Sequence, residues 1–252
     1  MAGRLLVGGA LEIQRARRTA HSVIEVIVFG EGPTEETFVR DVLSEQLADR
    51  EIFLDPRLIH TSKGASGGAL NWDRVKHFLR NALLQRTDTY VTTLFDLYGL
   101  PTEFPGYSEA HRLSEPVQRA AAIENAVHAA IIREVGCRED RFIPHIQPYE
   151  FESLLFSDVD TLPIVEEGWQ PCLESLRTVR RGASTPEHIN DGQQSHPSAR
   201  LAEILEKPSY DKRLHGAALA SRIGIARIRQ ECAHFGAWLA RIEALPPLRV
   251  GS

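Results

Sequence analysis

The feature that most constrains the fold of this chain is a regular alternation of apolar and amphipathic segments. The apolar segments are short and rich in β-branched residues, as buried strands are; they cover 23–29, 51–60, 89–95 and 140–147. The amphipathic segments have apolar residues at helical spacing; they cover 34–48, 72–84, 115–136 and 148–158. This alternation predicts an α/β fold, in which helices flank a mostly parallel sheet.

Local signals predict where some of these elements begin or break. Thr34 is the expected N-cap of the first helix, and Ser114 is the expected N-cap of the helix over 115–136. Pro56 lies inside the second apolar run, and a proline there predicts a break in the strand because it cannot donate a ladder hydrogen bond.

The chain after residue 160 contains helical segments and a polar stretch but no clear strand. We therefore expect three parts. They are a flexible N-terminal extension over 1–22, an α/β core over 23–160 and a helical cap packed on the core over 161–252.

The composition of the chain indicates in which cellular compartment the protein is expected. None of the 252 residues falls in an apolar run near the ~20 residues that a membrane span needs. The three cysteines, Cys137, Cys172 and Cys232, are far apart, which argues against a disulfide framework and against a zinc site. We therefore expect reduced thiols, a cytoplasmic protein and no membrane partner. The formal net charge of −5 does not indicate a surface coated for nucleic acid.

Acidic side chains follow three of the predicted strands. Glu31 lies between two glycines after the first strand, Asp96 follows the third, and Glu150 and Glu152 follow the fourth. The carboxyl ends of parallel strands meet at one edge of a sheet, where ligands bind. Carboxylates on neighbouring strands can share one cation, and Mg²⁺ prefers such oxygen ligands. The alternative is that these acids only cap the helices that follow.

A Gly/Ser-rich segment after the second strand, TSKGASGGALNW, carries Lys63 to the same edge. A cation there would stabilise the negative charge of a phosphoryl transition state. The segment lacks the residue order of a Walker A loop, so it does not indicate an ATP site. A surface loop with one solvated lysine is the alternative.

The predicted cap has a group of side chains suited to nucleic acid. Basic residues position phosphates, and an aromatic ring can stack on a base; the group comprises His196, Arg200, Tyr210, Lys212 and Arg213. Each of them alone is better interpreted as an ordinary surface residue, and it is their crowding near Gly216 that favours the group as a binding surface. His145 is interpreted as an interior histidine, and neither Cys232 nor His234 has a visible partner ligand.

Six ordered segments carry a family resemblance. They are FGEGPTEETFV, TTLFDLYGLP, QPYEFESLLFSD, HPSARL, YDKRLHG and IGIARIRQECAHFGAWLARIE, spread over 23–243. This set resembles an uncharacterised bacterial Toprim-like family with the pattern EGxTE…DLYG…EFE, distantly similar to RloB-like and OLD-type nucleases. The resemblance implies a Toprim-like sheet whose acids bind Mg²⁺ or Mn²⁺ for phosphodiester chemistry.

The resemblance also assigns roles to particular residues. Glu31 matches the glutamate that serves as general acid/base or metal ligand, and Asp96 matches the first aspartate of the D-x-D motif. Tyr98 occupies the place of the second aspartate, which weakens the case for two tightly held metals. Glu152 resembles the glutamate of the "FE" motif. Glu150 is its alternative, since these two positions do not share a helix face.

The leading hypothesis is therefore a Mg²⁺-dependent nuclease that acts on DNA or RNA, with the metal polarising the phosphoryl group and activating water. The resemblance implies anti-phage defence alongside an ABC- or SMC-like ATPase, and it leaves room for a homo-oligomer. One alternative is a non-catalytic Toprim-fold subunit that regulates such an ATPase, which Tyr98 favours. Another is a small-molecule phosphohydrolase, which the acidic pI of about 6.1 permits.

Overall fold

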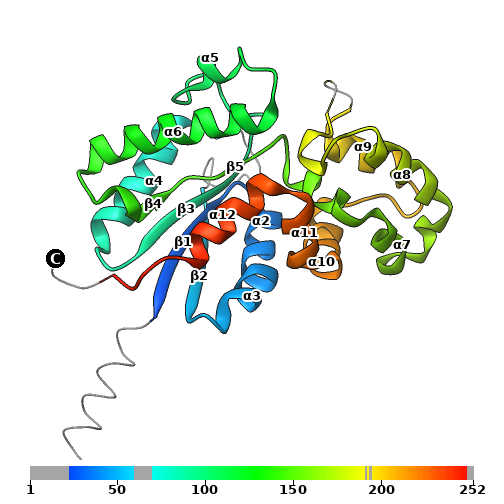
Figure 1. Ribbon diagram of the computed structural model, residues 1–252, viewed down its shortest axis with the longest axis horizontal. Coiled ribbons are helices and arrows are strands. Elements are labelled where there is room, and N and C mark those ends of the chain that lie inside the picture. The colour runs from blue at the N-terminus through cyan, green and yellow to red at the C-terminus, as the bar shows by residue number, and fades with distance from the viewer. Residues whose placement is uncertain (1–22, 60–69, 191, 193–194, 249–252) are drawn as a thin grey trace, which may run out of the picture.

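The computed structural model of the chain describes residues 23–59, 70–190, 192 and 195–248. It has the expected α/β class, with a mostly parallel sheet flanked by helices and a helical C-terminal region (Figure 1). The strands are β1 (Ile24–Gly30), β2 (Ile52–Leu58), β3 (Tyr90–Asp96), β4 (Phe142–Ile143) and β5 (Ile146–Gln147). Their order is β2-β1-β3-β4, with β5 pairing on β3.

The register of the strands brings their carboxyl ends together. All the pairings are parallel, and Gly30 at the end of β1 lies opposite Leu58 of β2 and Leu94 of β3. Asp96, the last residue of β3, lies opposite Gln147 of β5. The turns that follow β1, β3 and β5 therefore start from one edge of the sheet, as expected for parallel strands.

Alternate residues of the strands enter two separate hydrophobic clusters, one on each face of the sheet. Ile27 and Phe29 of β1 pack with α4 (Trp72–Gln85) and α6 (Pro116–Val135). Val26 and Val28 of β1 pack on the opposite face with the first helix and with much of the C-terminal region. The central strands β1 and β3 are thus buried on both faces, which explains why they are almost continuously apolar, whereas the edge strand β2 is partly exposed.

The first helix runs through three consecutive segments, α2 (Pro33–Phe38), the π-helical turn η1 (Val39–Leu43) and α3 (Ser44–Ala48). Its N-cap is Gly32, so the expectation of Thr34 is wrong; Pro33 takes the first helical position, for which its fixed φ is suited. The N-cap of α6 is likewise Glu115, not Ser114, and Pro116 follows it directly.

Two strand expectations also need correction. The run over 140–147 forms a 3₁₀ turn, η2 (Glu139–Arg141), and then two strands of two residues each. Pro144 lies between β4 and β5 and has no backbone N–H, which interrupts the ladder. Pro56 does not break β2, because β2 is the edge strand and the missing donor costs no pairing there.

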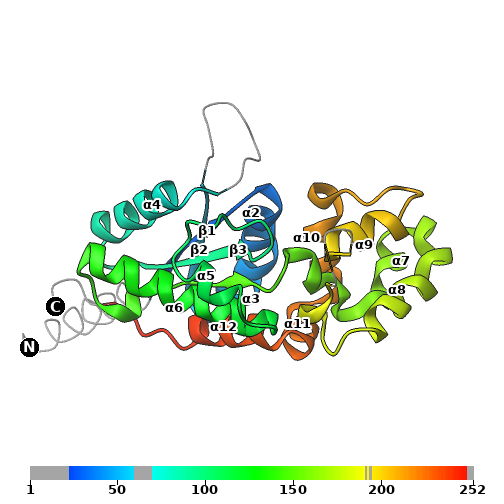
Figure 2. The same ribbon diagram turned by 90° about the horizontal axis from the view of Figure 1, so that it is seen from above.

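Short helices make up the rest of the described chain. Before the last strands comes α5 (Tyr107–Ala110); after them come η3 (Phe151–Thr161), α7 (Leu162–Val165), η4 (Glu167–Cys172), α8 (Leu173–Arg181), η5 (Pro186–His188), α9 (Pro197–Ile204), α10 (Lys212–Ile223), α11 (Ile225–Glu231) and α12 (Ala233–Glu243). The segment expected as a helix over 148–158 is therefore the 3₁₀ element η3. Helices α7 to α9 gather at one end of the elongated molecule, away from the sheet (Figure 2).

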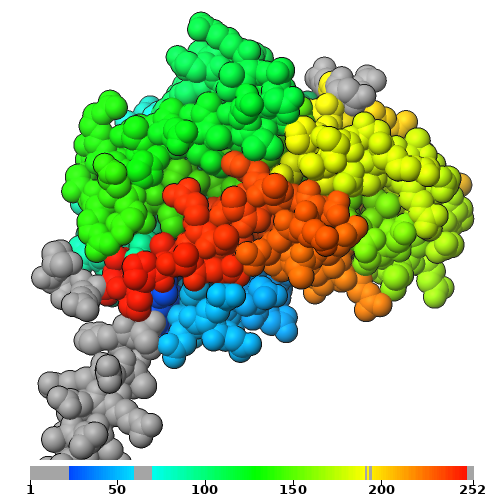
Figure 3. Space-filling view, in the orientation of Figure 1, coloured from blue at the N-terminus to red at the C-terminus, as the bar shows by residue number. Residues whose placement is uncertain are grey.

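The last helix returns to the sheet. The Trp238 indole Nε1 donates to Thr92 Oγ1 at 2.8 Å, and the Tyr90 hydroxyl donates to the Pro246 carbonyl at 2.7 Å. Phe235, Trp238 and Leu239 are buried in the core, as their helical spacing indicates. The segment from α10 to α12 thus forms a band along the molecule between its two ends (Figure 3). Over the described residues, the helices are all too short or too polar to traverse a lipid bilayer.

Candidate functional site

Glu31 lies in the turn from β1 to α2, and its carboxylate links this turn to the end of β3. The Asp96 backbone N–H donates to Glu31 Oε1 at 2.7 Å. The flanking glycines leave room for Glu35, which folds back over the turn. A Cβ at Gly30 would lie 3.0 Å from the Glu35 Cβ, and one at Gly32 would lie 3.2 Å from Glu35 Oε2. The glycines therefore allow two carboxylates to share one tight turn.

Asp96 and Glu152 bring two more carboxylates to this edge. Asp96 Oδ1 accepts a hydrogen bond of 2.8 Å from the Phe151 backbone N–H, which fixes the start of η3 against the end of β3. Glu152 follows in the first turn of η3 and has no exposed surface, and Glu35 is 2% exposed. We call Glu31, Glu35, Asp96 and Glu152 the acidic cluster.

One ammonium group lies among these carboxylates. Lys212 opens α10, and its Nζ is 3.1 Å from Glu35 Oε1, 3.3 Å from Glu152 Oε2 and 3.5 Å from Asp96 Oδ2. A close helix contact brings it there: a Cβ at Gly216, one turn along α10, would lie 2.8 Å from the Thr34 Cγ2. Glycine at 216 therefore lets α10 approach α2 closely enough for Lys212 to enter the acidic cluster.

Burial and mutual repulsion raise the pKa values of the carboxyl groups in the acidic cluster. Burial, together with the charge of Glu35, raises the pKa of Glu31 to about 8, against the hydrogen bond from Asp96 N–H and the charge of Lys212. Burial also raises the pKa of Asp96 well above its ordinary value, and it raises that of Glu152. Burial alone would lower the pKa of Lys212, but the surrounding carboxylates raise it well above its usual range. The cluster therefore carries more negative than positive charge, and Glu31, Asp96 and Glu152 take up protons more readily than ordinary carboxyl groups.

The donor set fits a hard divalent cation. Among the described residues, Glu35 Oε1 and Glu152 Oε2 are buried and accept no hydrogen bond, and each forms an ion pair with the Lys212 ammonium. Carboxylate oxygens without N or S ligands suit Mg²⁺ or Mn²⁺. Because Mg–O distances are about 2.1 Å, a cation in place of the ammonium needs these oxygens to close in by roughly 1 Å. Lys212 would have to withdraw from the centre.

Glu150, the alternative to Glu152, is engaged elsewhere. Its Oε2 accepts from the Ser198 backbone N–H at 2.9 Å and lies 3.1 Å from His196 Nδ1, so it holds the start of α9. The His196 ring stacks on Tyr98 with 4.6 Å between the centroids. The structure thus separates Glu150 from the acidic cluster and places Glu152 inside it.

The remaining residues that were predicted to contact nucleic acid do not all lie at the acidic cluster. The Tyr210 hydroxyl donates to Glu152 Oε1 at 3.4 Å, and burial raises the pKa of this phenol well above its ordinary value. Its polar end thus faces the acidic cluster. Arg213 lies beside Lys212 but is exposed, and Arg200 Nη1 is 3.9 Å from Glu203 Oε2. Lys63 lies outside the described residues.

The sequence patterns do not indicate the observed roles of two members of the site. Glu35 lies in the expected first turn of the helix over 34–48, where an acid is favoured for the helix alone, and Lys212 is predicted only as a contact for phosphate. The local signal for Glu35 is the spacing of four residues from Glu31, which brings both carboxylates back to one turn. No local signal places Lys212, because it meets Asp96 across 116 residues of sequence.

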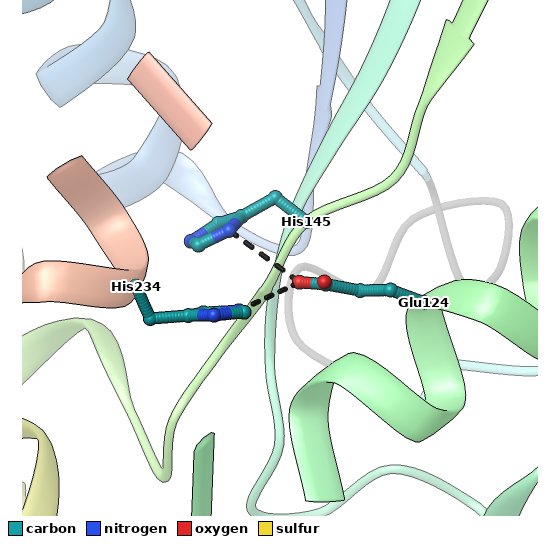
Figure 4. Close-up of side chains that lie close together, drawn as sticks. All are labelled: Glu124, His145 and His234. Carbon is teal, nitrogen blue, oxygen red and sulfur yellow. Dashed lines mark hydrogen bonds and ion pairs between the residues drawn. The ribbon is translucent and has the colours of Figure 1, made fainter. Parts of the chain in front are cut away.

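A second group of residues could hold a metal ion, and it shares no residue with the acidic cluster. It consists of Glu124, His145 and His234, and one potential ligand atom from each lies within 4.8 Å of the others (Figure 4). Burial lowers the pKa of His145 to about 3. The pKa of His234 is raised: burial acts to lower it, but the hydrogen bond and charge of Glu124 outweigh burial. His234 therefore does have partners that its sequence surroundings do not reveal.

A sequence family described as "Domain of unknown function (DUF4276)" matches residues 30–243. The match spans the acidic cluster and the Glu124–His145–His234 group. No curated protein and no solved structure matches the chain.

Proposed function

We propose a function for this chain, which belongs to the DUF4276 family. It is a Toprim-like, Mg²⁺-dependent nuclease that hydrolyses phosphodiester bonds in DNA or RNA. The observation that carries the proposal is the imbalance of charge in the acidic cluster. Three carboxylates contact a single ammonium and the fourth, Glu31, lies in the adjoining turn, and two buried carboxylate oxygens accept no hydrogen bond within the described residues. One ammonium does not balance the charges of these carboxylates, and unbalanced buried charge is costly, so such an arrangement favours a site that completes itself with a cation.

The carboxylates and the ammonium of the site would have different roles in this reaction. Glu35, Asp96 and Glu152 would hold a divalent cation, because their oxygens already converge on one point. The cation, when bound, would polarise the phosphoryl group and favour attack by water. Lys212, displaced from the centre, would remain at the rim, where an ammonium can stabilise the charge of the transition state.

Glu31 has the properties of a general acid. In the metal-free protein, burial and the charge of Glu35 raise its pKa to about 8. A bound cation would lower that pKa toward neutral pH, where a carboxyl group is suited to protonate a leaving oxygen. The Asp96 N–H holds Glu31 Oε1 in place and leaves the second carboxylate oxygen for this transfer. Sequence resemblance supports the same role for Glu31.

A non-catalytic binding subunit is the second candidate, and two observations favour it. The Lys212 ammonium already occupies the centre of the acidic cluster. Tyr98 replaces the second aspartate of the D-x-D motif and stacks on His196 at 4.6 Å. In this alternative, Lys212 is the permanent cation, and the fold serves a partner such as an ABC- or SMC-like ATPase. Anti-phage defence and that partner enter both candidates only through the resemblance.

The experiment that tests the proposal is cleavage of plasmid DNA, single-stranded DNA and bulk tRNA with Mg²⁺ or Mn²⁺. We expect metal-dependent cleavage that both Glu31→Gln and Asp96→Asn abolish. Glu45→Gln is the matched control, because Glu45 is exposed on α3 and touches no member of the acidic cluster. Turnover of mononucleotides but not of polynucleotides would favour a small-molecule phosphohydrolase. Absence of both cleavage and metal binding would favour the binding subunit.

A further inference from the structure

The group of Glu124, His145 and His234 joins three elements that are distant in sequence. Glu124 comes from α6, His145 from the link between β4 and β5, and His234 from the first turn of α12 (Figure 4). Glu124 Oε1 lies 2.8 Å from His234 Nε2 and 3.5 Å from His145 Nδ1. We call these three residues the His–Glu cluster.

Hydrogen bonding determines which nitrogen of His145 carries a proton. The Gln147 side-chain amide donates from Nε2 to Ser153 Oγ at 3.0 Å, which orients its oxygen Oε1 toward His145 Nε2 at 3.3 Å. An amide oxygen only accepts, so with the amide in this orientation His145 Nε2 carries the hydrogen. In the neutral ring, Nδ1 is then a bare lone pair that faces Glu124 Oε1.

Glu124 Oε1 already accepts a hydrogen bond from the Ile146 N–H and contacts His234 Nε2, but a cation beside it would also engage the lone pair of His145 Nδ1. A proton on His145 Nδ1 would supply one, but the ring is 1% exposed and stacks flat on Trp238, with 4.6 Å between the centroids. An imidazolium is strongly disfavoured in such surroundings. A ring N–H that donates to an amide, with the other nitrogen turned to a carboxylate and a second imidazole, is also how metal-ligating histidines are oriented.

We propose that the His–Glu cluster binds one transition-metal ion of the Zn²⁺ class, through Glu124, His145 Nδ1 and His234 Nε2. Tetrahedral Zn²⁺ with bonds of about 2.0–2.1 Å separates its ligand atoms by about 3.3 Å. The separations of 2.8 and 3.5 Å from Glu124 Oε1 bracket that value. Ligand atoms of the three residues all lie within 4.8 Å of one another, so the two histidine nitrogens need to approach by at most about 1.5 Å. Two imidazoles and one carboxylate favour Zn²⁺, Co²⁺ or Ni²⁺ over Mg²⁺.

The surroundings of the ligands hold them in place for such an ion. The Ile146 backbone N–H donates to Glu124 Oε1 at 2.8 Å. The His234 backbone N–H donates to Glu187 Oε2 at 3.0 Å, which anchors the start of α12. With three protein ligands, a fourth position is left for water. The ion would tie α12 to α6 and to the sheet, and it is independent of the acidic cluster and of the proposed nuclease activity.

The test is Zn²⁺ binding by the full-length protein after removal of metals with a chelator. We expect one Zn²⁺ per chain, bound at least ~10-fold more weakly by Glu124→Gln and by His234→Gln. His77→Ala is the control for surface histidines, because His77 is exposed on α4. Asp96→Asn should also keep wild-type Zn²⁺ affinity, which separates this site from the acidic cluster. Excess Mg²⁺ should not compete.

X-ray absorption at the zinc edge provides a readout on the wild-type protein alone, in case a variant does not fold. We expect two imidazole nitrogens, oxygen ligands and no sulfur. No stoichiometric binding, a spectrum with sulfur ligands, or equal affinity in His234→Gln and wild type would each overturn the proposal. Replacement of Zn²⁺ by Co²⁺ should give the visible absorption of a four-coordinate ion, and the spectrum of a hexa-aqua ion would contradict it.

Discussion

Replacing Lys212 by methionine tests whether its ammonium is the only cation that the acidic cluster holds. The change keeps an unbranched side chain, one heavy atom shorter, and removes the charge that contacts Glu35, Asp96 and Glu152. Removing one partner of a buried ion pair costs about 3–5 kcal/mol, because the other charge stays buried and unpaired. The Lys212 side chain keeps 36% of its surface exposed, so solvent screens part of the interaction. We therefore expect Lys212→Met to lose about 2–3 kcal/mol of unfolding free energy at pH 8.

The loss should shrink at pH 5.5. The raised pKa values of Glu31, Asp96 and Glu152 mean that these acids take up protons more readily than ordinary carboxyls, and protonation relieves the repulsion that the lysine had balanced. Urea unfolding at both pH values measures the effect. Arg213→Met is the matched control, because Arg213 is the exposed neighbour of Lys212.

Divalent cations should reverse the effect. Without the competing ammonium, Lys212→Met should bind Mn²⁺ more tightly than the wild type, and saturation at 100 times the Kd adds about 2.7 kcal/mol. The same variant should cleave nucleic acid more slowly. Stability equal to that of Arg213→Met at pH 8, or weaker Mn²⁺ binding than wild type, would refute this electrostatic reasoning.

Three further predictions concern single residues. In the metal-free protein, Glu31 holds its proton up to pH about 8 when folded but loses it near 4.5 when unfolded, so the folded state binds more protons between these values. The free energy of unfolding should therefore fall as pH rises from about 4.5 to 8. After allowance for the partial exposure of Glu31, Glu31→Gln should reduce this fall between pH 5.5 and 7.5 by about 1–2 kcal/mol, as measured by urea unfolding. An unchanged pH slope would contradict this reasoning. Gly216→Ala should destabilise by about 1–2 kcal/mol, because the added Cβ would lie 2.8 Å from Thr34 Cγ2, and it should weaken Mn²⁺ binding by moving α10; a more stable variant would show that the contact relaxes. Gln147→Met should lower Zn²⁺ affinity about 10–100-fold in a chelator competition, because His145 Nε2 loses its acceptor; unchanged affinity would show that the amide does not set the tautomer.

The sequence predicts the architecture well because the fold follows from periodicity. The alternation of apolar and amphipathic runs is enough to predict a parallel sheet with helices on both faces, and the turns after β1 and β3 must then share one edge. That reasoning brings Glu31 and Asp96 together, and the structure joins them through the hydrogen bond from Asp96 N–H. Glu152 follows from the same topology.

What the sequence does not predict depends on contacts between distant segments. Lys212 enters the acidic cluster because α10 packs closely on α2 at Gly216, and no local pattern encodes that approach. The His–Glu cluster is assembled from positions up to 110 residues apart, so it has none of the short spacings by which metal sites are recognised. The sequence predicts one strand over 140–147, which is longer than either observed strand. Pro144 interrupts the ladder there, and periodicity alone does not predict how long a ladder is.

Local capping rules failed for a related reason. Thr34 has a suitable side chain for an N-cap, but Pro33 begins the helix one residue before it, and Thr34 is buried against α10 instead. A proline at the first helical position thus outweighed the capping preference of the threonine. The same combination of proline and displaced cap recurs at the start of α6.

Anomalous diffraction at the manganese edge, from crystals grown with Mn²⁺, tests most directly whether the acidic cluster is a metal site. We predict one peak among Glu35, Asp96 and Glu152, with Lys212 Nζ displaced from its position 3.1–3.5 Å from their oxygens. An ammonium group that keeps that position, with no peak among the three carboxylates at saturating Mn²⁺, would contradict the proposed metal-dependent chemistry.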